Sequence, residues 1–512
     1  MNKYIKLAIP FAVGIVVYLI GCFAIDFADK AVIGGEPQLT HAIWIYLSIF
    51  IGVIVGLILE PIPPALVGLI GVAIAVFFKV GPAKSGDPEA VISSGSAINW
   101  GLTGFSNSTV WLIFAAFAIG LGYQQSGLGR RLALALVQKL GKSTLGLGYA
   151  IALTDGILAP FIPSNTARSG GVIYPIVSSI PPMFDSYPDK NPRKIGSYVM
   201  WVSLAITCVT SSMFLTGLAP NLLAVTTAAK SGVAEISWLN WFIAFLPAGI
   251  LLFILTPLLC YIIYPPEAKG SSEVVTWAKD EYTKLGLITS REKWMIGISV
   301  FALVFWILSS VDAVKGSFIE INATTTAVFV IIFMLAAKII SWNDFLSNKP
   351  AWNVLTWFAT LVALAEGLKN VGFLGWFSEI LKAYLVGFSP MAAILGLVLA
   401  FYLLHYFFAS TTAHVTALLV LFIVMAQAIE GVNVYLVTVL MMLSLGIMGI
   451  ITPYGTGPSP VYFGSGYIKG ADFWRLGTIF GLIFLVVFLI IEVPWVLYVV
   501  GDMITPAAAV AP

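Results

Sequence analysis

The feature that most constrains the fold of this chain is a series of uncharged apolar runs, each close to the length of a helix that crosses a membrane. The runs Leu47–Leu59, Trp294–Leu308 and Gly477–Ile491 contain no charged side chain. Of all 512 residues, 59% are hydrophobic and 10% are charged, whereas soluble domains carry roughly 25% charged residues. In lipid, a chain must satisfy its backbone hydrogen bonds internally, and apolar runs of this length do so as helices. The sequence therefore predicts an all-α polytopic membrane protein.

Eleven stretches are predicted to span the membrane. They lie near residues 5–25, 41–60, 64–80, 109–123, 197–229, 238–264, 294–311, 322–341, 353–369, 433–468 and 473–500. Two further apolar stretches, 144–182 and 390–430, are interrupted in the middle by polar residues and by Pro or Gly. Irregular backbone at this depth is tolerated only where it is buried in protein or lines a cavity. We therefore predict that each of these two is a re-entrant hairpin, which enters and leaves on the same side.

Basic residues set the predicted orientation. With the N-terminus inside, 18 of the 26 Lys and Arg residues fall on the inner side and 7 on the outer side, and the remaining one is Arg168. Cytoplasmic loops carry the excess of basic residues. The prediction is a multi-pass protein of the cell inner (plasma) membrane, surrounded by membrane lipid, with a cytoplasmic N-terminus and an outside C-terminus. The chain has 26 basic and 24 acidic residues and is therefore nearly neutral, so nucleic acid is not expected as a partner.

The chain also matches itself weakly at an offset of 246 residues. Identical pairs at this offset include Trp111 and Trp357, Gly141 and Gly387, Ser164 and Ser410, and Thr166 and Thr412. In the predicted topology one copy opens from the inside and the other from the outside, so the repeats are inverted. Inverted repeats with interrupted helices in corresponding places are typical of secondary transporters, whose site lies at the repeat interface. The alternative is the weak self-similarity that any polytopic protein shows.

The repeat divides the chain into five predicted regions. These are N-terminal scaffold helices (1–108), first-repeat transport elements (109–230, with the hairpin 144–182 and a broken helix 197–229), second-repeat scaffold helices with the cytoplasmic loop 265–293 (231–352), second-repeat transport elements (353–472, with the hairpin 390–430 and a broken helix 433–468), and the last helix and C-terminus (473–512).

The hairpin tips carry short hydroxyl and amide clusters. The first tip contains Ser164, Asn165 and Thr166, and the second contains Ser410, Thr411 and Thr412. Helix starts present unpaired N–H groups and a partial positive charge, which suit carboxylates. Two such tips facing each other could bind the two ends of a dicarboxylate. Either tip alone would be interpreted as the N-cap of a buried helix.

Two broken helices follow the hairpins. The first break is Thr216–Asn221, and the second, Thr452–Pro460, holds three Pro and two Gly residues. Gly and Pro at membrane depth release backbone groups that must find partners, and a polar ligand is one. A structural kink is the alternative for the first break.

Arg168 is the one basic residue assigned to the membrane interior, and its counterpart in the second repeat is His414. A cation in this environment costs several kcal/mol unless it is paired. An anionic substrate would serve as the partner, and so would Asp155 on the same hairpin. The sequence leaves both alternatives open.

These residues resemble the divalent anion:sodium symporter family of di- and tricarboxylate transporters, and the resemblance covers nearly the whole chain. It implies a homodimer that works by an elevator mechanism. It also implies a substrate site formed by Ser164, Asn165, Thr166, Ser410, Thr411, Thr412, Thr452 and Pro453.

Thr411, where sodium-coupled members have Asn, together with the segments Tyr454–Pro458 and Tyr462–Tyr467, makes the chain more similar to the exchanger branch. There a fixed cation at Arg168, helped by His414, could compensate substrate charge in place of sodium. An empty carrier with a bare positive charge would cross poorly, so obligate exchange would follow.

The function predicted from the sequence is therefore sodium-independent antiport of C4 and C5 dicarboxylates such as 2-oxoglutarate, succinate and malate. The alternative is a sodium-coupled di- or tricarboxylate symporter. We expect no enzymatic activity, no cofactor and no metal site, with sodium ions bound only under the alternative.

Overall fold

The computed structural model describes residues 3–29, 32–33, 36–83, 91–270, 272–311, 314, 317, 322–385, 387 and 389–505, so the ends of the two terminal regions (1–2 and 506–512) lie outside it. The helices of the first half are α1 (Lys3–Ala24), α2 (His41–Leu59), α3 (Pro64–Phe77), α4 (Ser94–Gly101), α5 (Ser108–Ser126), α6 (Leu128–Leu140), α7 (Thr144–Leu158), α8 (Tyr174–Val177), α9 (Gly196–Met213), α10 (Ala219–Lys230) and α11 (Trp238–Ile263). Those of the second half are α12 (Ser272–Lys284), α13 (Ser290–Leu308), α14 (Ala323–Ala336), α15 (Trp342–Leu346), α16 (Lys349–Asn370), α17 (Phe373–Leu385), α18 (Pro390–Leu404), α19 (Thr411–Gln427), α20 (Val434–Leu443), α21 (Ser459–Gly464), α22 (Gly470–Val487) and α23 (Gly501–Ile504). Two short antiparallel strands, β1 (Val32–Ile33) and β2 (Glu36–Pro37), follow α1.

The prediction of an all-helical multi-span protein is confirmed. Each of the eleven predicted spanning stretches coincides with a helix or with a broken pair of helices. By length and composition, seven helices of the described part of the chain could each cross a membrane: Tyr4–Ala24, His41–Leu59, Gly196–Met213, Trp238–Ile263, Lys349–Asn370, Pro390–Phe407 and Gly470–Val499. Several of the shorter apolar helices belong to the hairpins and the broken helices.

The order and lengths of the helices follow the repeat offset seen in the sequence. Helix α7 begins at Thr144 and α18 at Pro390, which is 246 residues later, and both helices have 15 residues. The helices before them also correspond, since α5 and α6 match α16 and α17. Each copy packs against scaffold helices of the other: α5 of the first repeat packs against α14, and α16 of the second repeat packs against α3.

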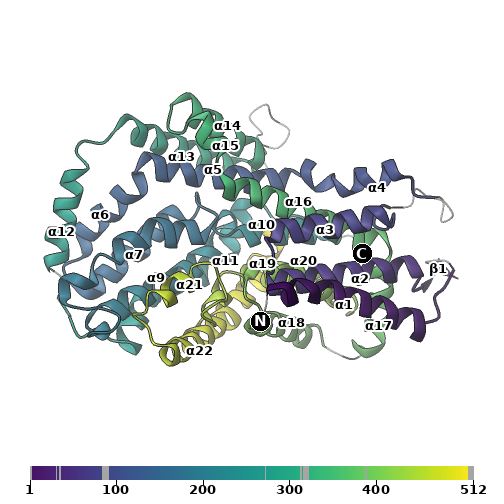
Figure 1. The fold of residues 1–512 in the computed structure, drawn as a ribbon. Helices are drawn as coiled ribbons and strands as arrows, with labels where there is room; N and C mark the ends of the chain where they lie inside the picture. The colour runs from purple at the N-terminus through teal and green to yellow at the C-terminus, as the bar shows by residue number, and fades with distance from the viewer. Residues whose placement is uncertain are drawn as a thin grey trace.

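The two hairpins open in opposite directions. The first consists of α7, a π-helical segment (Thr166–Ile173) and α8, which returns to contact α6. The second consists of α18 and α19. Its two ends lie close together, since a Cβ placed on Gly431, just after α19, would lie 3.1 Å from Cγ of Pro390, at the start of α18. In Figure 1 the base of the first hairpin lies with α6 and α12 at the left, whereas α17, which leads into the second hairpin, lies near β1 at the right.

Several helices were not predicted from the sequence, among them α6, α12 and α17. Helix α12 occupies the predicted polar loop 265–293, where Thr144 N donates to Lys269 O at the base of the first hairpin. Helices α6 and α17 are equivalent members of the two repeats and precede the hairpins. Charged residues on one face lower the mean hydropathy of such amphipathic helices, which therefore do not resemble spanning segments.

The most deeply buried elements are α9 and the repeat-related α20. Seventeen of the 18 residues of α9 are buried, and all of α20 from Tyr435 to Leu443 is buried as well. Helix α9 packs against α11 and α7, while α20 packs against α18 and α19. The broken helices therefore run through the core of the molecule, with the hairpins packed against them.

Candidate substrate site

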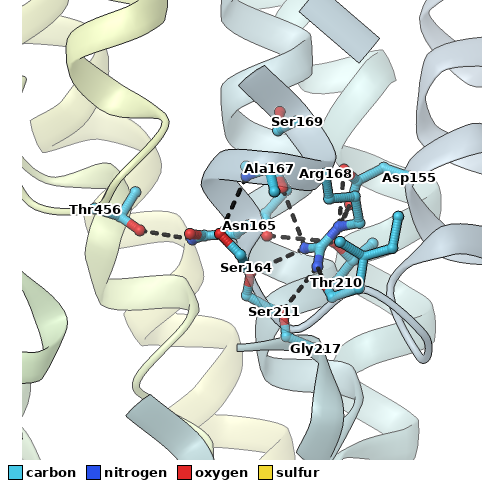
Figure 2. Close-up of polar contacts among 12 residues, drawn as sticks. Asp155, Ser164, Asn165, Ala167, Arg168, Ser169, Thr210, Ser211, Gly217 and Thr456 are labelled. Carbon is cyan, nitrogen blue, oxygen red and sulfur yellow. Dashed lines mark hydrogen bonds and ion pairs between the residues drawn. The ribbon is translucent and has the colours of Figure 1, made fainter. Parts of the chain in front are cut away.

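The first tip is built by a helix cap. After α7 the chain is irregular until Ser164, whose hydroxyl accepts a hydrogen bond from Ala167 N at 3.1 Å. The next helical segment begins at Thr166. Asn165 is 5% exposed, and its amide Nδ2 donates to Thr456 Oγ1 at 2.7 Å. This hydrogen bond joins the first hairpin to the second break (Figure 2).

Thr166 lies against a glycine of the second break. A Cβ built on Gly457 would come within 1.8 Å of Thr166 Oγ1. The threonine hydroxyl and the glycine backbone can therefore approach each other only because no side chain intervenes.

The second tip repeats the same construction. Ser410 is the N-cap of α19, and its hydroxyl accepts from Ala413 N at 3.1 Å. Thr411 Oγ1 donates to Gly455 O at 3.4 Å, and Thr412 is 6% exposed. The interpretation of the two serines as N-caps is thus correct, and each cap presents the start of a helix to the second break.

The tips converge on consecutive residues of that break. The first reaches Thr456 through Asn165, and the second reaches Gly455 through Thr411. Thr452, immediately before Pro453, is fully buried, and its hydroxyl has no hydrogen-bond partner among the described residues. A buried hydroxyl without a partner carries a desolvation cost of about 1–3 kcal/mol, which a polar ligand could offset.

His405 also belongs to this cluster. It is fully buried at the end of the first arm of the second hairpin, and its Nε2 lies 2.8 Å from Gly455 O. A Cβ on Gly455 would lie 2.9 Å from Thr452 Oγ1 and 3.1 Å from His405 Nε2, so the three residues pack together. The signal available in the sequence was a histidine five residues before Ser410, at a position where the first repeat has Ala159.

Arg168 is enclosed by protein oxygen atoms. Its side chain is 0% exposed, and its Nε lies 3.2 Å from both carboxylate oxygens of Asp155. The terminal nitrogen atoms donate to the carbonyls of Ile162 and Gly217 and to the hydroxyls of Thr207, Thr210 and Ser211. Thr210 also donates a hydrogen bond to Asp155. All five N–H groups of the guanidinium therefore have partners, and the charge is paired within the protein (Figure 2).

The structure thus favours Asp155 over the substrate as the partner of Arg168. A guanidinium whose hydrogen bonds are all made inside the protein has none left for a substrate carboxylate in this conformation. In this conformation the carboxylate of Asp155 already neutralises Arg168, so the geometry does not support compensation of substrate charge by this residue.

His414 is packed among aromatic rings. Its ring centroid lies 4.3 Å from that of Phe401 and 5.1 Å from those of His405 and Phe408. Within the described part of the chain neither ring nitrogen has a hydrogen-bond partner. The geometry shows His414 as a packed residue behind the second tip, and its role in charge compensation stays a prediction.

The first break is hydrogen-bonded to the first hairpin. Thr216 Oγ1 donates to Pro160 O at 2.6 Å, and Ala219 N donates to Pro163 O at 2.9 Å. These bonds attach the break to the first tip. The second break, by contrast, contacts both tips, so the two repeats contribute unequally to the site.

Comparisons with known proteins identify the family of the chain. The family described as "Sodium:sulfate symporter transmembrane region" matches residues 31–501 of the chain. The chain belongs to this family of divalent anion:sodium symporters. Membership of a transporter family agrees with the prediction that the protein is not an enzyme.

Relatives within the family include the L-tartrate/succinate antiporters of Escherichia coli (strain K12) and Shigella sonnei (strain Ss046). Each is 46% identical over 458 residues, which cover 88% of this chain and 92% of the relative. These antiporters belong to the exchanger branch that the sequence resembled.

Solved structures support the fold alone. The YdaH transporter of Alcanivorax borkumensis aligns with a TM-score of 0.54 and 12% identity over 85% of this chain and 98% of its own. MtrF of Neisseria gonorrhoeae, described as illuminating a class of antimetabolite efflux pumps, aligns with a TM-score of 0.55 and 13% identity over 89% of this chain and 95% of its own.

Proposed function

We propose that this family member exchanges C4 and C5 dicarboxylates, such as succinate, tartrate, malate and 2-oxoglutarate, across the cell membrane. The observation that carries the proposal is the convergence of two serine-capped helix starts on Gly455 and Thr456. Each start offers N–H groups to one carboxylate, as helix N-termini do for anions. Ser164, Asn165 and Thr166 would bind one end of the substrate, and Ser410, Thr411 and Thr412 the other.

The second break would bind the middle of the substrate. Thr452 supplies a buried hydroxyl, and the proline after it supplies no N–H, so the backbone there cannot continue a regular helix. Tartrate and succinate, for which the antiporter relatives are named, are dicarboxylates, and two facing helix starts suit a dicarboxylate.

Sodium independence is supported by the surroundings of Arg168. The two carbonyls and three hydroxyls that face its guanidinium are the kind of oxygen ligands that a hard cation requires. Because the side chain already donates to these atoms, a sodium ion would have to compete with it. The Arg168 guanidinium, held in place by Asp155, would then occupy the oxygen atoms that could otherwise bind a sodium ion.

The deciding experiment is counterflow in proteoliposomes. Vesicles preloaded with succinate should take up labelled succinate, tartrate, malate and 2-oxoglutarate equally well in sodium and in potassium buffer. Empty vesicles should take up none. Uptake that requires sodium but no internal substrate would show that the chain is a symporter instead.

Three further properties belong to the same proposal. The C-terminus is outside and α12 cytoplasmic, the assembly is a homodimer, and the hairpins move with the broken helices as an elevator. A cysteine placed on α12 should react with an impermeant maleimide only in inside-out vesicles, and chemical crosslinking in native membranes should give dimers.

A further inference from the structure

A cavity outside the candidate site lies on the α12 side of the molecule. It has a volume of about 680 Å³ and is bounded by the end of α5, the start of α6, the returning arm of the first hairpin, and α12. Its polar lining includes Gln124, Arg130, Ser179 and Glu281. These residues belong to none of the contacts described at the hairpin tips.

The cavity extends toward the first tip. Gly171 and Val172 line it, and they lie five and six residues after Thr166, or less than two helical turns away. Tyr123, also in the lining, stacks on Phe161 with a centroid distance of 5.7 Å. Phe161 lies three residues before Ser164, so the inner end of the cavity lies beside the first tip.

The outer end carries a shared ion pair. Arg130 Nη2 lies 2.7 Å from Glu281 Oε2, and Lys284 Nζ lies 2.6 Å from the other oxygen of the same carboxylate. The two cations and one carboxylate sum to a charge of +1. The side chain of Arg130 is 56% exposed whereas that of Glu281 is 18% exposed, so the arginine is accessible from the cavity. The neighbouring Arg131 is buried and separately paired with Glu292.

We propose that this cavity is the vestibule by which dicarboxylates reach the first tip from the α12 side, and that Arg130 captures them there in competition with Glu281. The inference rests on the proposed function. A positive group at the mouth of a cleft raises the local concentration of anions and their rate of association. Because Glu281 already shares its charge between two cations, a dianion can replace it at Arg130 without leaving the carboxylate unpaired.

The test compares two substitutions that remove opposite charges from the same ion pair. Arg130→Gln should raise KM for succinate exchange about three- to tenfold at low ionic strength, with little change in the maximal rate. Glu281→Gln should lower KM, because it leaves Arg130 free. At roughly 0.5 M salt, charges in water are screened within a few ångströms, so both changes in KM should fall below about twofold.

Controls separate capture from a structural link between α6 and α12. Lys139→Gln removes one exposed charge from α6 away from the cavity and should leave KM unchanged. Arg130→Lys keeps the positive charge and should have a KM close to that of the wild type. The variants should alter KM for transport from one face only, measured in inside-out and right-side-out vesicles.

Two results would overturn the inference. One is a rise in KM in both charge-removing variants, which is what the loss of a helix–helix link would give. The other is an equal effect from both faces of the membrane. Failure of the proposed function is distinguishable, because wild-type vesicles would then show no succinate counterflow at all.

Discussion

Replacing Asp155 by Asn should destabilise the protein far more than an ordinary substitution. The side chains of Asp155 and Arg168 are both 0% exposed, so water cannot compensate a cation that loses its carboxylate. Removing one partner of a buried pair costs about 3–5 kcal/mol. Arg168→Gln should cost a similar amount because it leaves the carboxylate unpaired. The free energy of unfolding lost in the double variant should be about 0.5–3 kcal/mol smaller than the sum of the losses in the two single variants, as expected for residues in contact.

Reversible unfolding in mixed micelles measures these free energies, and counterflow on the same samples measures exchange. Lys190→Gln, which removes an exposed ion pair with Asp185, is the control and should unfold like the wild type. The reasoning would be refuted if Asp155→Asn were as stable as the wild type while Arg168→Gln lost exchange. That result would mean that the substrate, and not Asp155, is the partner of the guanidinium.

The remaining predictions concern contacts between elements. Gly457→Ala should reduce exchange at least tenfold with normal expression, because the added methyl group would lie 1.8 Å from the hydroxyl of Thr166; wild-type rates of counterflow would contradict this close approach. Asn165→Ala removes the 2.7 Å hydrogen bond between the first hairpin and the second break, and purified protein should lose succinate-induced thermal stabilisation, whereas unchanged stabilisation would exclude Asn165 from the site. Lys230→Gln breaks the 2.9 Å ion pair that joins α10 to Glu366 on α16. Because this pair is partly exposed, its loss should shift the balance between conformations at most about fivefold, which spin-label distances between α10 and α16 would report; an unchanged distance distribution would show that the pair does not stabilise this conformation.

The sequence predicted the parts of the site that depend on local structure. Ser164 and Ser410 each accept a hydrogen bond from the N–H three residues later. A cap of this kind involves one turn of chain, so its pattern is visible in a few consecutive letters. The offset of 246 residues was visible for the same reason, since it repeats these local patterns in one register.

Contacts between distant segments could not be predicted in this way. Asn165 and Thr456 are 291 residues apart in the sequence, and His405 meets Gly455 only because α18 ends beside the second break. Arg168 illustrates the difference most clearly. Its lone charge in an apolar chain indicated a buried cation, but the choice between substrate and Asp155 depended on how the two arms of the hairpin pack.

The sequence by itself thus determined which apolar segments are helical, where the two hairpins lie, and that two equivalent tips exist, because hydropathy and capping act over single turns and single helices. Only the tertiary structure decided that both tips meet the second break, that Arg168 is paired within the protein, and that α6 and α12 enclose a cavity beside the first tip. These properties depend on which side chains are excluded from water together, and that is set by packing across the whole fold.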